Sequence, residues 1–147
     1  MNVIVASPPT EVRQCRVRLV TGPAAPGEAR SQVRAAIRDW GVPVDPDAAV
    51  LLTSELVTNA IACETGETVT LGIRCLRGGF RVDVYDTSLS FPVVTVAPGD
   101  AETGRGLMLV AALAAEWGFY RTPAGKAVYF TLLFRDVGMG PPAPGGS

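Results

Sequence analysis

The sequence predicts a two-layer α+β domain, with helices packed on one face of a mostly antiparallel sheet. Four segments alternate between apolar and polar residues, which is typical of strands with one buried face. Three others place apolar residues three or four positions apart, as amphipathic helices do. The order along the chain is strand, helix, helix, strand, strand, helix, strand. No internal repeat or second core is evident.

The first strand and the first helix are predicted within residues 12–41. Residues 12–20 alternate, and Cys15, Val17 and Leu19 share one side of the predicted strand. Gly41 follows the last apolar position of the helix, as expected of a residue that ends a helix. The apolar positions at helical spacing are Ala29, Val33, Ile37 and Trp40.

The second helix carries the most informative residues. Asp45 is a good N-cap and Pro46 suits the first helical position, and the helix is expected to reach about residue 62. Glu55 and Asn59 are four residues apart, so they lie one above the other on one face. A carboxylate and a carboxamide on an otherwise apolar stripe are costly unless a polar group meets them. Taken alone, the pair is also typical of the solvent-facing edge of an amphipathic helix.

A hairpin is predicted next. Residues 67–76 and 80–86 alternate on either side of the turn Arg77-Gly78-Gly79. The second of these strands ends on Asp86. Alone, an Asp at this place is typical of a turn or a cap.

No periodicity is found in residues 89–103, a stretch long enough to predict a functional or mobile loop. The stretch ends on Gly104-Arg105-Gly106-Leu107, where we expect a helix to begin. Backbone N–H groups at a helix start bind anions, and glycine allows an anion to approach closely.

The third helix is expected to end at Gly118, and a last strand follows it. Leu107, Val110, Ala114 and Trp117 would share one face of the helix. The alternating apolar residues of the last strand are Val128, Phe130, Leu132 and Phe134.

Composition limits the functions to consider. The 147 residues suit one domain, expected at 12–136 between an N-terminal tail at 1–11 and a disordered Gly/Pro-rich tail at 137–147. Hydrophobic residues make up 48%, enough for a core. Lys+Arg number 13 and Asp+Glu 14, so no basic excess predicts a nucleic-acid or membrane-surface partner.

The absence of His excludes His-based acid–base chemistry, His metal ligands and a phosphohistidine on this chain. Three Cys without a C-x-x-C motif predict neither a disulfide framework nor a zinc site, and they fit a reducing, cytoplasmic setting. The longest apolar run, residues 107–115, is too short to span a bilayer. We see no signal peptide.

Taken together, these motifs resemble a known family. The Glu-x-x-x-Asn helix, the strand ending in Asp86, the long loop and the Gly-Arg-Gly-Leu helix start are similar to the motifs of the GHKL ATP-binding superfamily (the Bergerat fold). Within it, the initial strand and helix and the ending Trp-Gly…Gly-Lys-x-Val-x-Phe look most like the anti-sigma-factor serine/threonine-kinase branch. The resemblance covers residues 12–134.

The resemblance implies a role for each matched position. Asn59 would ligate Mg²⁺ bridging the ATP phosphates, Glu55 would be the general base, and Asp86 would accept the exocyclic amine of adenine. Residues 89–103 would form the lid over the nucleotide. Gly104, Arg105 and Gly106 would contact the phosphates. Ser88 and Leu107 are the remaining nucleotide-binding residues that the resemblance implies.

The chain departs from the family pattern at three places. The motif at the end of the strand is usually Asp-x-Gly, whereas here it is Asp86-Thr87-Ser88, although Ser occurs often in this branch. Members of this branch often have a His and a basic residue shortly after the Asn, whereas here the run is Ile61-Ala62-Cys63-Glu64. A Thr expected near the start of the last strand, close to the adenine, is replaced by Ala127. We expect this replacement to remove one hydrogen bond around Asp86.

Three functions follow from the resemblance. The first is a Mg²⁺- and ATP-dependent serine kinase that phosphorylates an anti-sigma-factor antagonist and otherwise holds a sigma factor. The second is a non-catalytic partner-binding regulatory module that keeps the fold, either nucleotide-binding or independent of nucleotide. The third, the catalytic domain of a sensor histidine kinase, ranks last because the chain has no His and no preceding helical hairpin. The sequence identifies no partner, and it leaves a homodimer through the first strand open.

Overall fold

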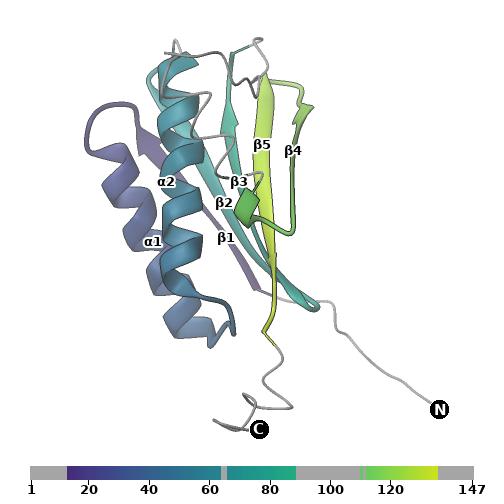
Figure 1. The fold of residues 1–147 in the computed structure, drawn as a ribbon. Helices are drawn as coiled ribbons and strands as arrows, with labels where there is room; N and C mark the ends of the chain where they lie inside the picture. The colour runs from purple at the N-terminus through teal and green to yellow at the C-terminus, as the bar shows by residue number, and fades with distance from the viewer. Residues whose placement is uncertain (1–12, 64–65, 89–109, 111, 136–147) are drawn as a thin grey trace, which may run out of the picture.

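The computed structural model describes residues 13–63, 66–88, 110 and 112–135, and it confirms the predicted α+β class. Two helices lie side by side on one face of a five-stranded sheet (Figure 1). The elements in chain order are β1 (Arg13–Val20), α1 (Ala25–Trp40), α2 (Pro46–Cys63), β2 (Thr68–Leu76), β3 (Gly79–Asp86), β4 (Glu116–Arg121) and β5 (Lys126–Leu133).

The sheet order is β1-β2-β3-β5-β4, and every neighbouring pair is antiparallel. The hairpin predicted at residues 67–86 is confirmed as β2 and β3, which occupy the middle of the sheet together with β5. Gly78 has a φ of 85° in the connecting turn, a conformation that glycine adopts without strain. The strands β1 and β4 form the two edges.

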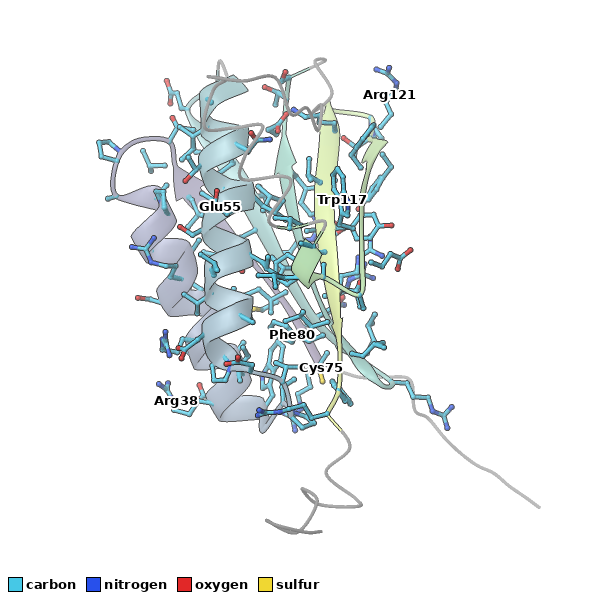
Figure 2. The ribbon with its side chains drawn as sticks, in the orientation of Figure 1. Arg38, Glu55, Cys75, Phe80, Trp117 and Arg121 are labelled. Atoms are coloured by element: carbon cyan, nitrogen blue, oxygen red, sulfur yellow. The ribbon has the colours of Figure 1, made fainter. Side chains whose placement is uncertain are left out.

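The core fills the space between the helices and one face of the sheet. Successive strand residues point to opposite faces, so the central strands β2, β3 and β5 give alternate side chains to this core, whereas the edge strand β1 buries only Leu19. The largest side chains buried there are Phe80, Phe130, Leu19, Leu52, Leu56, Leu71 and Ile73. Phe80 lies between α2 and the sheet in Figure 2.

The end of α1 and the start of α2 lie where the sequence predicts, whereas α1 begins at Ala25, within the stretch 22–26 expected to be a loop. Gly41 has a φ of 64°, and its N–H closes the last turn of α1 on the carbonyl groups of Ile37 and Arg38. At the start of α2, the Asp45 carboxylate accepts a hydrogen bond of 3.0 Å from the backbone N–H of Asp47, as expected of an N-cap. No helix that the structure describes is long and apolar enough to cross a membrane.

The predicted helical position of Trp117 is wrong. The backbone N–H of Ala114 donates to Val110 in the helical pattern, but that of Ala115 donates to Thr131 of β5 at 2.9 Å. Glu116–Arg121 then forms the edge strand β4, which holds Trp117 (Figure 2). Three aromatic residues in six favour a strand, and their pairing with β5 overrides the helical spacing on which the prediction rested.

Gly118 is therefore a strand residue and not the end of a helix. A Cβ added there would lie 3.0–3.2 Å from the hydroxyl oxygen and two ring carbons of Tyr129, on the neighbouring strand β5. Close packing of the Tyr129 ring on the backbone, and not a helix stop, accounts for glycine at this position.

Candidate functional site

Glu55 and Asn59 lie in the C-terminal half of α2, as predicted, and Figure 2 labels Glu55 there. Glu55 is half-buried, whereas the Asn59 side chain is buried beside the apolar residues of the helix. No described residue forms a hydrogen bond with the Asn59 carboxamide. A buried amide without a protein partner is costly, so this side chain is suited to meeting a ligand.

Asp86 ends β3 at the same end of the domain as the C-terminal half of α2 (Figure 1). It lies on the helix-facing side of the sheet, two residues after buried Val84. Its carboxylate accepts a 2.8 Å hydrogen bond from the backbone N–H of Ser88. This bond fixes the carboxylate at the point where the chain leaves the sheet.

Lys126 is the main partner of Asp86. Its ammonium lies 2.8 Å from each carboxylate oxygen, and the two side chains are 3% and 0% exposed. A buried ion pair of this kind is strongly destabilised when one partner is removed. Lys126 is the site residue that our reading of the sequence missed, although it stood in the Gly-Lys-x-Val-x-Phe motif.

The expectation that Ala127 neighbours Asp86 is wrong. In the β3–β5 register Asp86 is opposite Lys126, whereas Ala127 is opposite Tyr85. Side chains alternate between the two faces, so Ala127 points to the face of the sheet without helices. A hydrogen bond lost around Asp86 cannot be attributed to Ala127.

Gly125 allows β5 to begin close to the end of β3. A Cβ added at Gly125 would collide with the carbonyl oxygen of Asp86 and lie 2.5 Å from the Cα of Thr87. Both atoms belong to the backbone, so no side-chain rotation relieves the overlap. Gly125 thus holds Lys126 within reach of the Asp86 carboxylate.

The donor set fits Mg²⁺ better than a metal bound by side chains alone. Among the described residues, no group of three or more His, Cys, Asp or Glu side chains lies close enough to hold a metal ion. Mg²⁺ prefers oxygen ligands, keeps several waters and often uses one protein oxygen together with substrate phosphates. The buried carboxamide oxygen of Asn59 is an oxygen of that kind.

Several implied nucleotide-binding positions lie outside the described residues. They are the predicted lid at 89–103 and the residues Gly104, Arg105, Gly106 and Leu107. Ser88 is described, and its backbone N–H is already engaged by Asp86. The candidate positions that the structure describes are therefore Glu55 and Asn59 on α2 and the Asp86–Lys126 pair on β3 and β5.

A second polar network covers the face of the sheet opposite α1 and α2. Its centre is Asp83, whose side chain is 1% exposed. The guanidinium of Arg81 donates to both carboxylate oxygens at 2.9 Å, and the Tyr120 hydroxyl donates to one of them at 2.8 Å. Burial, followed by the neighbouring Tyr85 and Asp83, raises the pKa of Tyr120 above its ordinary range.

The Arg81 guanidinium is held from two sides. It lies 3.9 Å from the centroid of the Tyr129 ring, in addition to its bonds with Asp83. The hydrogen bonds to Asp83 raise the pKa of Arg81 further above its ordinary value. This network is separated from Asp86 by the thickness of the sheet, so we treat it as structural.

A hollow of about 620 Å³ lies beside this network, over the same face. Its lining includes Arg16 of β1 and Tyr85 of β3, whose ring lies 4.6 Å from the Arg16 guanidinium. Asp86 and Thr87 also line this hollow, at the end of β3.

Comparisons with known proteins agree with this geometry. Residues 19–132 match a family model described as a histidine kinase-like ATPase domain. The chain is also similar to the crystal structure of the RsbU and RsbW domains of Rv1364c from Mycobacterium tuberculosis, with a TM-score of 0.58 and 18% identity. That match covers 83% of this chain and 32% of the other, and at this identity it shows a shared fold. No curated protein sequence matches the chain.

Proposed function

Because this chain belongs to the histidine kinase-like ATPase family, we propose that it is an ATP- and Mg²⁺-dependent serine/threonine-protein kinase acting as an anti-sigma regulatory factor. Its substrate is an anti-sigma-factor antagonist, and it holds a sigma factor when the antagonist is absent. The fold shared with a chain that contains an RsbW domain agrees with this branch. The kinase specificity and both partners are part of the proposal.

The observation that carries the proposal is the buried Asn59 carboxamide, which has no hydrogen-bond partner among the described residues. Its oxygen would hold Mg²⁺ together with the phosphates of ATP. When bound, Mg²⁺ neutralises charge on the phosphates during transfer. Glu55 stands one helical turn before Asn59, which puts a carboxylate next to the phosphates.

In the proposed reaction Glu55 accepts the proton of a serine or threonine hydroxyl on the partner protein. The hydroxyl oxygen bonds to the γ-phosphorus of ATP as the bond to the β–γ bridging oxygen breaks, and ADP leaves. Because Glu55 is half-buried, it is shielded from water and still open to an incoming side chain. Positioning and charge neutralisation provide most of the catalysis in such a transfer.

A second candidate is a non-catalytic partner-binding module of the same fold. The observation that favours it is the run at residues 61–64, which lacks the basic residue of the family pattern. This module would bind its partner without phosphorylating it.

The remaining features of the proposal follow from the sequence. Under this proposal residues 12–136 are the kinase-like domain, and the protein acts in the cytoplasm. The edge strand β1 is available for pairing with a second copy, so a homodimer is included as an alternative assembly. Neither nucleic acid nor a membrane is a partner in this proposal.

The test is calorimetric titration of the full chain with ATP, with and without Mg²⁺, repeated on variants of α2. Asn59→Ala is expected to abolish Mg²⁺-dependent binding, because it removes the metal ligand. Glu55→Gln is expected to leave the dissociation constant within about threefold of wild type, since a general base adds little to ground-state binding. Thr58→Ala, an exposed position on the same helix, is the control.

Phosphotransfer is then measured with labelled ATP and a candidate antagonist. Loss of transfer in Glu55→Gln with binding retained supports the kinase. Nucleotide binding and partner binding without transfer in the wild type would favour the non-catalytic module. A well-folded wild type that binds no nucleotide at millimolar concentration would refute the kinase proposal.

A further inference from the structure

The Asp86–Lys126 pair has unused hydrogen-bonding capacity. An ammonium has three N–H donors, and a carboxylate has two acceptor positions on each oxygen. Lys126 donates to both oxygens of Asp86, and no other described residue accepts its third N–H. Asp86 Oδ1 also accepts a hydrogen bond from the backbone N–H of Ser88. Among the described residues, Oδ2 accepts a hydrogen bond from Lys126 alone. The Tyr120 hydroxyl donates to Asp83, on the other face of the sheet.

One donor on Lys126 and one acceptor on Asp86 therefore remain next to each other. Both side chains are almost completely removed from solvent, at 3% and 0% exposed. A buried donor or acceptor left unmade costs free energy, so the pair is suited to a ligand that offers an acceptor and a donor side by side.

The edge of a purine base offers that combination. We propose that Lys126 and Asp86 together read the base of the bound nucleotide, with Lys126 as the residue that sets base specificity. The proposal rests on the proposed nucleotide site. Adenine would donate its exocyclic amine to Asp86 Oδ2 and accept at N1 from the Lys126 ammonium.

The same pair also accepts guanine or hypoxanthine. In these bases N1–H is the donor and O6 the acceptor, so Asp86 Oδ2 accepts from N1–H and Lys126 donates to O6. A carboxylate without Lys126 would instead face the O6 lone pairs, an unfavourable contact of like polarity. Lys126 thus relaxes a site that Asp86 alone restricts to adenine.

The strand register identifies Lys126, and not its neighbour, as the reader of the base. Lys126 is opposite Asp86 and shares the buried face with Val128 and Phe130, whereas Ala127 points to the other face. Gly125 lies against the backbone of residues 86 and 87, which fixes the start of β5 against the end of β3. The donor and acceptor are therefore held in place before the base arrives.

The experiment is calorimetric titration of the full chain with ATP, GTP and inosine triphosphate in the presence of Mg²⁺. Inosine triphosphate has the N1–H and O6 groups of guanine but no 2-amino group. Its affinity therefore tests hydrogen bonding at N1 and O6 without the extra bulk of that amino group. Wild type is expected to bind all three within about tenfold, because each base satisfies both partners. Lys126→Met is expected to bind ATP about tenfold more weakly, and inosine triphosphate at least a hundredfold more weakly.

Two controls keep the outcome interpretable. Arg18→Met removes one positive charge from the exposed face of β1 and is expected to leave all three affinities unchanged. Thermal unfolding of Lys126→Met checks that the variant is folded, and the wild-type ratio of ATP to inosine triphosphate tests the proposal without any variant.

Each result has a distinct meaning. Wild type that binds ATP but rejects inosine triphosphate and GTP by a hundredfold or more overturns the base-reading role and leaves the kinase proposal intact. An unchanged ratio in Lys126→Met overturns the role of Lys126. Failure of all three nucleotides to bind overturns the proposed nucleotide site itself, and this inference with it.

Discussion

The buried carboxylate of Asp83 is expected to make a large electrostatic contribution to the stability of the sheet. Asp83→Ala removes two hydrogen bonds of 2.9 Å from Arg81 and one of 2.8 Å from the Tyr120 hydroxyl. It also leaves the Arg81 guanidinium, whose side chain is only 20% exposed, without its carboxylate. Breaking a buried pair by removing one partner typically costs about 3–5 kcal/mol.

We place Asp83→Ala at the lower end, about 3 kcal/mol, since Arg81 keeps some solvent contact and its Tyr129 ring. With about 4 °C per kcal/mol for a domain of this size, the melting temperature should fall by roughly 12 °C. The assay is urea unfolding followed by tryptophan fluorescence, with thermal unfolding by circular dichroism. A typical domain stability of about 5–15 kcal/mol leaves the variant folded at low temperature.

Arg74→Ala is the matched control, because Arg74 also approaches Asp83 but at 3.5 Å and with 37% of its side chain exposed. It is expected to cost less than about 1 kcal/mol. The double variant Asp83→Leu with Arg81→Met should lose less stability than Asp83→Ala alone, since no uncompensated charge remains. A loss for Asp83→Ala no larger than that for Arg74→Ala would refute this reasoning.

Two further predictions test the edge strand. Gly118→Ala is expected to destabilise the protein by about 1 kcal/mol in urea unfolding, because the new methyl group would press on the Tyr129 ring; a stabilised variant would contradict the close packing described above. The raised pKa of Tyr120 means that its folded state holds the proton more tightly, so the stability it adds is present below about pH 10 and is lost as pH rises above that value. The urea midpoint should therefore fall more steeply above about pH 10 in wild type than in Tyr120→Phe, and equal slopes in the two proteins would contradict this.

Local chemistry was enough to predict most of the fold. The Asp45 cap, the Gly41 stop and the turn at Gly78 are determined by residues close in sequence, and the structure places each as expected. The alternation of β1, β2, β3 and β5 was equally direct, because one face of each strand is buried by the helices.

The error at Trp117 had a tertiary cause. Residues 107–117 carry apolar side chains at helical spacing, and only the hydrogen bond from Ala115 to Thr131 shows where the chain leaves that conformation. An edge strand is stabilised by hydrogen bonds to its one neighbouring strand, which the local sequence does not reveal. A short edge strand after a helical turn is therefore difficult to recognise from local patterns.

The position of Lys126 depends on the strand register, which the sequence motifs alone do not determine. The motifs placed Asp86 at the end of a strand and a Gly-Lys-x-Val-x-Phe run on another, but they did not say which of Lys126 and Ala127 faces the carboxylate. Alternation answers this once Val128 and Phe130 are known to be buried, because residue 126 must then share their face. A shift of one residue in the β3–β5 pairing would bury Ala127 beside Asp86 and turn Lys126 outward. The antiparallel register of these two strands therefore determines whether this end of the sheet presents a carboxylate alone or a carboxylate paired with an ammonium.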